Sequence, residues 1–339
     1  MKRVILIVLI CLAIVAGGFL LFTHQDFSFK GGEGFSIFST PTPMNTILIF
    51  TGDIMLGRSV EIKLQKFGEG DYFFPFARIS EWLNSADLTF GNLEGPVSDR
   101  GTKVGSIYSF RFNPLVVKAL KKAGFEVVSL ANNHIWDYGP QAFLDTLDNL
   151  KTGGIDYVGA GKNFAEAHAG VTKVVNGTSI TFLAYTPLLA KSLNATADHF
   201  GINVLDLEQM DLDIKSAKAH SDLVVVSFHF GEEYKPKHNQ YQETVAHRAV
   251  DAGADLIIGH HPHVAEDLEQ YCPPSRQASE GQACAWIAYS LGNFIFDQYF
   301  SPETMQGLVL RVTLSGKTIS KVEPLTVQLN DNFQPALTE

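Results

Sequence analysis

The sequence has few cysteines and no long run of lysine and arginine. Its three cysteines are too few for a zinc site built from four thiolates, although Cys272 and Cys284 flank a polar loop and could pair in an oxidising compartment, a point that the sequence leaves open. Acidic residues outnumber basic residues by 36 to 26, which gives a formal net charge of −10 and argues against nucleic acid as a partner. The sequence therefore excludes cysteine-only zinc modules and disfavours nucleic-acid binding.

Only one long apolar run is present, at the beginning of the chain. Val4 to Phe22 contains no charged residue and follows Lys2 and Arg3. A run of about 20 apolar residues is long enough to cross a bilayer. Because its small residues lie inside the run rather than after it, the pattern favours an uncleaved anchor over a cleaved signal peptide. The two cations at its start predict a single-pass protein of the cell membrane, with the rest of the chain outside the cytoplasm.

Composition and pattern divide the chain into four predicted regions. Residues 1–24 form the N-terminal anchor or signal, and residues 25–45, rich in Gly, Ser, Thr and Pro, form a linker. Residues 46–330 form one folded domain, and residues 331–339 form a C-terminal tail.

Short apolar runs alternate with helical patterns over most of the domain, which is typical of an α/β fold. Several of these runs are apolar throughout, as expected for strands that are buried on both faces. The predicted strands are Ile47 to Phe50, Leu88 to Phe90, Val127 to Leu130, Ile180 to Ala184, Leu223 to Phe228, Leu256 to Ile258 and Trp286 to Tyr289. The predicted helices are Leu115 to Lys122, Gln141 to Lys151 and Gln240 to Ala252. Gly307 to Val327 alternates apolar and polar residues and predicts an antiparallel hairpin around Ser315 and Gly316.

Polar residues follow nearly every predicted strand. Because the carboxyl ends of the strands in an α/β sheet form the edge where ligands bind, we expect these residues to meet at one site. They are Asp53 in FTGDIML, Asn92 and Glu94 in FGNLEG, Asn132, Asn133 and His134 in SLANNH, His229 in VVVSFHFGEEY, His260, His261 and His263 in LIIGHHPH, and Asn293 in YSLGNF.

Histidines and acids at these strand ends favour a metal site. A single histidine after a strand is more often a structural residue than a ligand, but His260, His261 and His263 place three imidazoles within four residues. Imidazole nitrogens with carboxylate oxygens suit a divalent Zn, Mn or Fe ion, whereas Ca and Mg prefer oxygen ligands almost alone. For Asp53 the alternative role is to cap a following helix, and for Glu94 it is to brace a turn.

Six ordered sequence blocks between residues 51 and 298 resemble the poly-γ-glutamate capsule biosynthesis family of the CapA or PgsA type. The blocks are TGDIMLGR, FGNLEGPVS, SLANNHIWDYG, SFHFGEEY, GHHPHV and YSLGNFIFDQ. Members of this family resemble the calcineurin-like metallophosphoesterases. The resemblance implies an α/β fold with a four-layer αββα sandwich, preceded here by the N-terminal transmembrane helix.

The resemblance also implies roles for single residues. Asp53 resembles the first metal carboxylate, and Glu94 stands where a bridging aspartate is usual. Asn133 resembles a metal-binding amide, and His134 resembles the catalytic imidazole that faces the substrate. The predicted metal ligands are Asp53, Glu94, Asn133, His229, His261 and His263, with His260 as an alternative member of the last pair. The predicted catalytic residues are His134 and Asn133.

One position departs from the phosphoesterase pattern, because Met55 stands two residues after Asp53, where a histidine ligand is usual. The leading hypothesis is a metal-dependent hydrolase or transferase that handles poly-γ-glutamate or a related anionic polymer at the membrane, within a polymer synthase complex. The loss at Met55 favours a second hypothesis, a non-catalytic, membrane-anchored component that binds or assembles the polymer. A glycosidase using Glu94 with Glu232 or Glu233 would leave the histidines unexplained.

Overall fold

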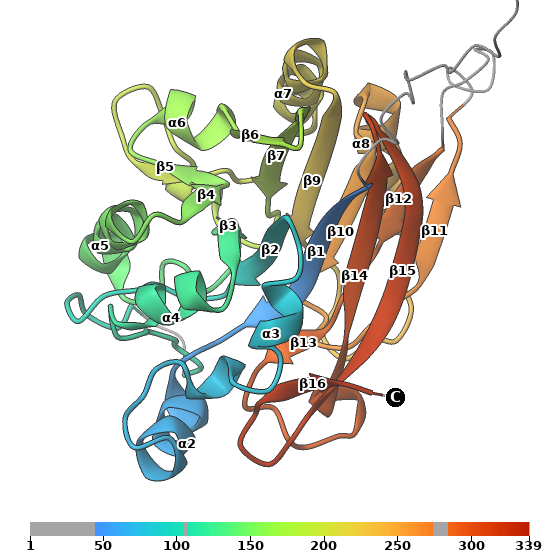
Figure 1. Ribbon diagram of the computed structural model, residues 1–339. Helices are drawn as coiled ribbons and strands as arrows, with labels where there is room; N and C mark the ends of the chain where they lie inside the picture. Colours follow the sequence, from blue (N-terminus) through green and yellow to red (C-terminus); the bar gives the residue numbers. More distant parts are fainter. Residues whose placement is uncertain (1–44, 105–106, 274–283, 339) are drawn as a thin grey trace, which may run out of the picture. The chain divides into compact units, whose positions relative to one another are not determined.

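The structure is a computed structural model that describes residues 45–104, 107–273 and 284–338 (Figure 1). The predicted anchor, residues 1–24, and the predicted linker up to residue 44 lie outside these residues. Among the helices that are described, none has the length and apolar character needed to span a bilayer. Internal contacts group the described residues into one unit.

The first sheet begins with the first strand of the domain and has eight strands. They are β1 (Asn45–Ile54), β2 (Leu88–Leu93), β3 (Phe125–Ser129), β4 (Asp156–Val158), β13 (Asn293–Ile295), β14 (Gln306–Ser315), β15 (Thr318–Leu329) and β16 (Pro335–Leu337). Strands β1 to β4 are parallel neighbours, while β14, β15 and β16 extend the other side of β1 in antiparallel order. The short β13 pairs in parallel with the end of β1, so three chain segments, β1, β2 and β13, meet at that strand end.

The second sheet has six strands. They are β6 (Val171–Val175), β7 (Thr178–Tyr185), β9 (Leu223–His229), β10 (Leu256–His260), β11 (Leu268–Tyr271) and β12 (Ala285–Ala288). The four inner strands β7, β9, β10 and β12 are parallel, and β6 and β11 close the two edges in antiparallel pairing. A further pair joins β5 (Ala160–Gly161) to β8 (Gly201–Ile202).

Helices connect many of these strands. They are α2 (Arg58–Phe67), α3 (Ser80–Leu83), α4 (Val116–Lys122), α5 (Gly139–Thr152), α6 (Phe164–His168), α7 (Leu207–His220) and α8 (Gln240–Ala252). In Figure 1, α7 and α8 lie along the second sheet, and α4 and α5 lie beside β3 and β4 of the first.

The two sheets pack against each other through aromatic side chains. Phe90 of β2 stacks on Phe182 of β7 with 5.6 Å between ring centroids, and Phe50 of β1 contacts Phe90 at 5.9 Å. The main apolar core contains residues of both sheets, while a second cluster joins the other face of the second sheet to α7 and α8. The second sheet is therefore covered on both faces, as expected for strands without polar alternation.

Close backbone contacts fix the ends of β1 and β10. A Cβ on Gly52 would lie 2.0 Å from the carbonyl oxygen of Gly292, which also accepts the Asp53 N–H at 2.9 Å. A Cβ on Gly259 would lie 1.8 Å from the carbonyl oxygen of Tyr289. Since only glycine fits such approaches, these two positions allow the following polar residues to lie between neighbouring strands.

The mixed α/β fold is confirmed. All seven predicted strands are present, as β1, β2, β3, β7, β9, β10 and β12, and the predicted helices and hairpin correspond to α4, α5, α8 and β14–β15. Helix α7 was not predicted, because it buries only Met210 and Ile214 and so lacks a full apolar stripe. Residues assigned to the C-terminal tail include β16, which pairs with β15 and follows the buried Phe333.

The structure pairs Cys272 with Cys284, which the sequence left open. The bridge closes a loop across a separation of 12 residues, with 4.4 Å between the two Cα atoms. It ties the end of β11 to the start of β12, which are already antiparallel neighbours at Tyr271 and Ala285.

Replacement of Phe90 by alanine is expected to lower the free energy of unfolding by about 3–5 kcal/mol, because it removes a fully buried ring at the contact between the sheets. Chemical denaturation measures the loss. Leu212 on α7 is 61% exposed, and Leu212→Ala, the control, should change the same quantity by less than about 0.5 kcal/mol. Equal losses in the two variants would contradict this packing.

Candidate metal centre

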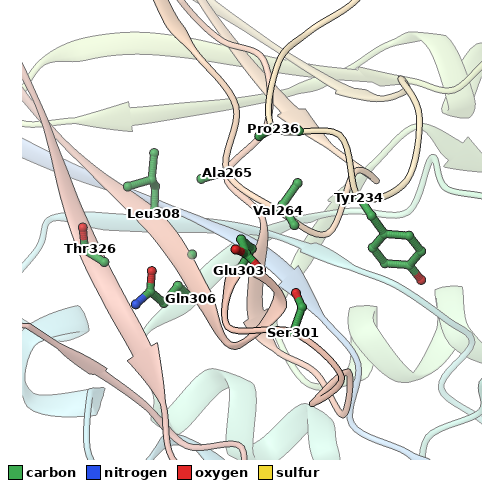
Figure 2. Close-up of a pocket in the computed structure, with 10 residues that line it drawn as sticks. Tyr234, Pro236, Val264, Ala265, Ser301, Glu303, Gln306, Leu308 and Thr326 are labelled. Carbon is green, nitrogen blue, oxygen red and sulfur yellow. The ribbon is translucent and has the colours of Figure 1, made fainter.

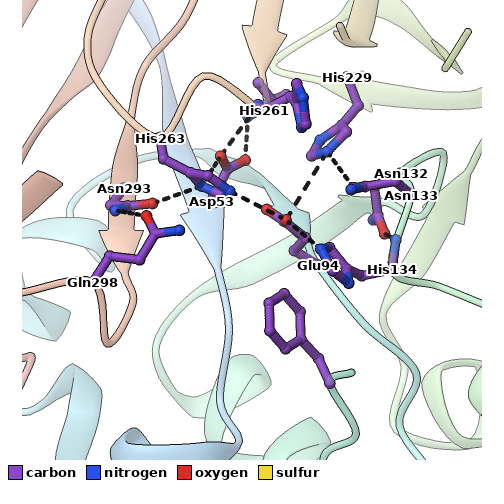
Figure 3. Close-up of polar contacts among 12 residues, drawn as sticks. Asp53, Glu94, Asn132, Asn133, His134, His229, His261, His263, Asn293 and Gln298 are labelled. Atoms are coloured by element: carbon purple, nitrogen blue, oxygen red, sulfur yellow. Dashed lines mark hydrogen bonds and ion pairs between the residues drawn. The ribbon is translucent and has the colours of Figure 1, made fainter. Parts of the chain in front are cut away.

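The strand ends of both sheets bring the predicted residues to one place (Figure 3). Asp53 at the end of β1 lies opposite Asn92 of β2 on one side and Asn293 of β13 on the other. In the second sheet, His229 at the end of β9 lies opposite His260 at the end of β10. The parallel order thus gathers side chains that are up to 240 residues apart in the sequence.

Glu94 lies at the middle of this cluster. Its Oε1 is 3.8 Å from His134 Nε2, 4.0 Å from His229 Nε2 and 3.8 Å from His263 Nε2. The carboxylate is fully buried, and neither of its oxygens has a hydrogen-bond partner among the described residues. A buried carboxylate is costly without compensation, so three ring nitrogens facing one unpaired oxygen fit a bound cation.

The electrostatics of the buried groups favour neutral imidazoles. Burial, followed by the charge of His261, holds the pKa of His229 well below its usual value. Burial and the neighbouring His263 lower the pKa of His261 to about 3. Burial and the charge of Asp53 raise the pKa of the Glu94 carboxyl well above its usual range. Neutral rings keep lone pairs for a metal, and a divalent cation would favour ionised Glu94.

Asp53 shows the opposite shift. Burial alone would raise the pKa of its carboxyl, but contacts with His260 and His263 outweigh burial and hold that pKa well below its usual range. The Nδ1 atoms of these rings lie 3.3 Å and 3.4 Å from the carboxylate. Asp53 also accepts the backbone N–H of His261 at 3.2 Å.

A ladder of amides orients His229. Asn92 Nδ2 donates to Asp53 Oδ1 at 2.8 Å and faces His229 Nδ1 at 3.2 Å, while Asn132 Nδ2 donates to Asn92 Oδ1 at 3.2 Å. The other ring nitrogen of His229, Nε2, lies 2.8 Å from Asn133 Oδ1. Because an N–H of Asn92 faces Nδ1, Nε2 of His229 carries the ring proton and donates it to Asn133 Oδ1; a cation next to Glu94 would have to displace this proton to bind Nε2 and Asn133 Oδ1.

His134 is held by a residue that the sequence analysis did not assign. Asp137 Oδ2 lies 2.7 Å from His134 Nδ1 and also accepts the backbone N–H of Phe110 at 2.7 Å. The His134 ring stacks on Phe110 with 3.9 Å between centroids. Since Asp137 accepts the Nδ1 proton, Nε2 of His134 is left facing Glu94. The sequence did contain a signal for this contact, because Asp137 follows His134 by three residues and so lies close to it along the chain.

His263 is fixed in a similar way by Asn293. The amide nitrogen of Asn293 donates to Gln298 Oε1 at 3.0 Å and to Thr304 O at 2.9 Å. Its oxygen must then face His263 Nδ1, at 3.1 Å, so this nitrogen carries the proton and Nε2 is free to bind a cation. Gln298 also donates to the hydroxyl of Tyr234 at 3.0 Å.

The predicted ligands fall into distinct positions. The ligand atoms of Asp53, Glu94 and His229 lie within 4.8 Å of one another, and so do those of Glu233, His261 and His263. His260 is fully buried, with its Nδ1 3.3 Å from Asp53 Oδ1, and belongs to neither group. Imidazole, carboxylate and amide donors together fit Zn, Mn or Fe. Metal binding by these residues stays a prediction, which the geometry of the site supports.

A cleft of about 580 Å³ opens beside the centre. Its lining residues include Asn133, His134, Glu233 and His263, together with Arg58, which pairs with Asp297 at 3.0 Å. A second cavity, of about 530 Å³, lies beyond Tyr234 and contains no histidine among its lining residues (Figure 2). A substrate that reaches His134 would therefore enter through the first cleft.

The fold and the site together define an α/β protein with a buried cluster of histidine, carboxylate and amide side chains at the strand ends. A family profile described as bacterial capsule synthesis protein PGA_cap matches residues 47–298. The chain belongs to this family, which confirms the resemblance carried by the six sequence blocks.

Curated relatives agree with the family. A capsule biosynthesis protein CapA of Bacillus anthracis is 37% identical over 290 residues, which cover 83% of this chain and 67% of that protein. A PGA biosynthesis protein CapA of Bacillus subtilis is 37% identical over 252 residues, which cover 74% of this chain and 63% of that protein. The chain thus spans about two thirds of the length of these two relatives.

Solved structures are more distant. A phosphatase from Mycoplasma pneumoniae has a TM-score of 0.48 and 17% identity, covering 84% of this chain and 94% of that one. The calcineurin-like phosphoesterase YfkN of Bacillus subtilis has a TM-score of 0.42 and 13% identity, covering 83% and 90%. TM-scores below 0.5 support no inference about the chemistry of the centre.

Substitution of His229 by alanine is expected to weaken binding of Zn or Mn, because it removes a fully buried ring nitrogen beside Glu94. Loss of a residue that only hydrogen-bonds a metal ligand lowers metal affinity roughly 10–100-fold, and loss of the ligand His229 itself should lower it further. Titration of the metal-free protein, with elemental analysis, measures this change. His238→Ala is the control, since His238 pairs with Asp267 away from the centre. Wild-type affinity in His229→Ala would rule out His229 as a ligand.

Proposed function

We propose that this chain is a capsule-polymer biosynthesis protein with a cation-dependent hydrolase or transferase site. The relatives named for capsule and PGA biosynthesis support poly-γ-glutamate, or a related anionic polymer or precursor, as the substrate class. The convergence of three histidine Nε2 atoms on the unpaired Glu94 oxygen carries the chemical part of the proposal. We also propose that the two packed sheets with their helices are the four-layer αββα sandwich of metallophosphoesterases.

The residues of this chain would divide the work. Asp53, Glu94, Asn133 and His229 would hold the cation, which when bound supplies Lewis acidity and a nucleophilic water near neutral pH. His134 lines the cleft with Nδ1 beside Asp137; in its imidazolium form it would give the Nε2 proton to a leaving oxygen as a general acid, and the Nδ1 proton would stay on Asp137's side of the ring. Burial of the ligands keeps bulk water from the deeper part of the site.

His134→Ala is expected to lower polymer output in cells and to reduce the rate of substrate turnover about 10²–10⁴-fold, because a positioned proton donor is lost. Polymer released by a strain that carries the variant at its natural locus is the measurement. Protein amount is checked by immunoblot, and His238→Ala is the matched histidine control. Unchanged polymer output in His134→Ala would contradict the catalytic proposal.

Met55 supports a second candidate, a non-catalytic polymer-binding or assembly component. The side chain is fully buried, and its Sδ accepts the backbone N–H of Gly57 at 3.2 Å. It therefore offers packing where the related enzymes place a histidine ligand. In this case deletion of residues 1–24 would abolish polymer output, while His134→Ala would leave it intact.

We propose that the N-terminal run is a membrane anchor and that the domain lies outside the cytoplasm, within a polymer synthase complex. The uncharged run from Val4 to Phe22 after Lys2 and Arg3 supports the anchor. The bridge between Cys272 and Cys284 supports an oxidising compartment.

Alkylation of thiols during lysis of cells in a denaturant without reductant is expected to leave Cys272 and Cys284 unmodified until a reductant is added, because an extracytoplasmic disulfide is retained. Mass spectrometry of the peptides that contain the two residues reads the result. Full alkylation of both thiols without reductant would contradict the proposed location.

A further inference from the structure

A second group of metal-binding side chains lies beside the centre and includes a residue outside the predicted ligand set. The ligand atoms of Glu233, His261 and His263 lie within 4.8 Å of one another. We propose that these three residues form a second cation position, which takes the place of the one that lost its histidine at Met55. This inference rests on the proposed cation centre, and the experiment below separates the two.

The two imidazoles of this group are both buried. The side chains of His261 and His263 are only 7% and 2% exposed. His261 Nδ1 is buried and has no hydrogen-bond partner in the part of the chain that is described. A buried ring nitrogen without a partner is unfavourable, and a cation bound by this group would remove the unfavourable burial.

The backbone connects the segment that contains Glu233 to the loop that contains His261 and His263. His261, His263 and Tyr234 have φ values of 98°, 61° and 62°, in the left-handed region that residues other than glycine rarely adopt. The Tyr234 N–H donates to the Pro262 carbonyl at 2.8 Å, between the two histidines. This hydrogen bond holds the segment with Glu233 against the loop of His261 and His263. Strained backbone conformations of this kind occur most often at functional sites.

Charge also favours a second cation. Asp53, Glu94 and Glu233 place three carboxylates around one cluster of rings. A divalent ion at the first position would offset two negative charges, and Glu233 would remain unbalanced beside it. Arg58, which lines the same cleft, is already paired with Asp297.

The two positions differ in access. Asp53, Glu94 and His229 are at most 1% exposed, whereas Glu233 is exposed and lines the cleft of about 580 Å³. Two imidazoles and one carboxylate are a three-ligand zinc set that leaves a coordination position open. The second cation would therefore be zinc-like, exchangeable and available to a substrate oxygen in the cleft.

The test titrates the metal-free, detergent-purified full chain with Zn²⁺ and counts bound ions by calorimetry and elemental analysis. The wild type should bind two equivalents. Glu233→Gln should keep the tight equivalent and bind the other at least about tenfold more weakly. Glu232→Gln is the matched control, because this neighbouring carboxylate contacts Asn239 and lies in neither ligand group; it should bind two equivalents.

The same titration of His229→Ala separates the two claims. Loss of the tight equivalent in this variant, with the second retained, would support both positions. One equivalent in the wild type, unaffected by Glu233→Gln but lost in His229→Ala, would overturn the second position and leave the proposed centre standing. No bound ion in the wild type would overturn both, and equal effects of Glu232→Gln and Glu233→Gln would overturn the assignment to Glu233. Circular dichroism confirms folding of each variant.

Discussion

The buried carboxylate of Glu94 is the constraint on which the centre depends. Leaving a buried polar group unsatisfied costs about 1–3 kcal/mol, and more when the group is charged. Glu94 is fully buried with both oxygens unpaired among the described residues, while the ring nitrogens of His134, His229 and His263 face it at 3.8–4.0 Å. In the proposed centre, a bound cation would satisfy the carboxylate and the rings together.

The fold creates this situation by stacking two mainly parallel sheets. Phe90 and Phe182 bring β2 and β7 together, and the same stacking places the ends of β1 and β2 opposite those of β9 and β10. Glycines at the strand ends allow close approach, and amides and Asp137 then set which nitrogen of each ring faces inward. Packing, backbone freedom and hydrogen bonding thus act in sequence to build one centre. The cleft beside it gives a substrate access to His134.

Much of this architecture could be predicted from the sequence, because apolar runs identify buried strands and their ends identify the ligand edge. Asp53, Glu94, Asn133 and His229 were found by that reasoning. Asp137 and Gln298 were not, since their contacts arise from turns and loops whose path an apolar pattern does not specify. Helix α7 was missed for a related reason, as only Met210 and Ile214 of its residues are buried. The periodic spacing of apolar residues indicates which face of a helix or strand is buried, so it gives no signal for a segment that is mostly exposed.

The most direct test of the account is anomalous X-ray diffraction from crystals of the protein grown with Zn²⁺ or Mn²⁺. The account predicts a strong anomalous peak bounded by Asp53, Glu94, Asn133 and His229, with Glu94 Oε1 among the nearest atoms. Crystals that show no peak there, or a Glu94 side chain hydrogen-bonded to protein groups and remote from any ion, would contradict it.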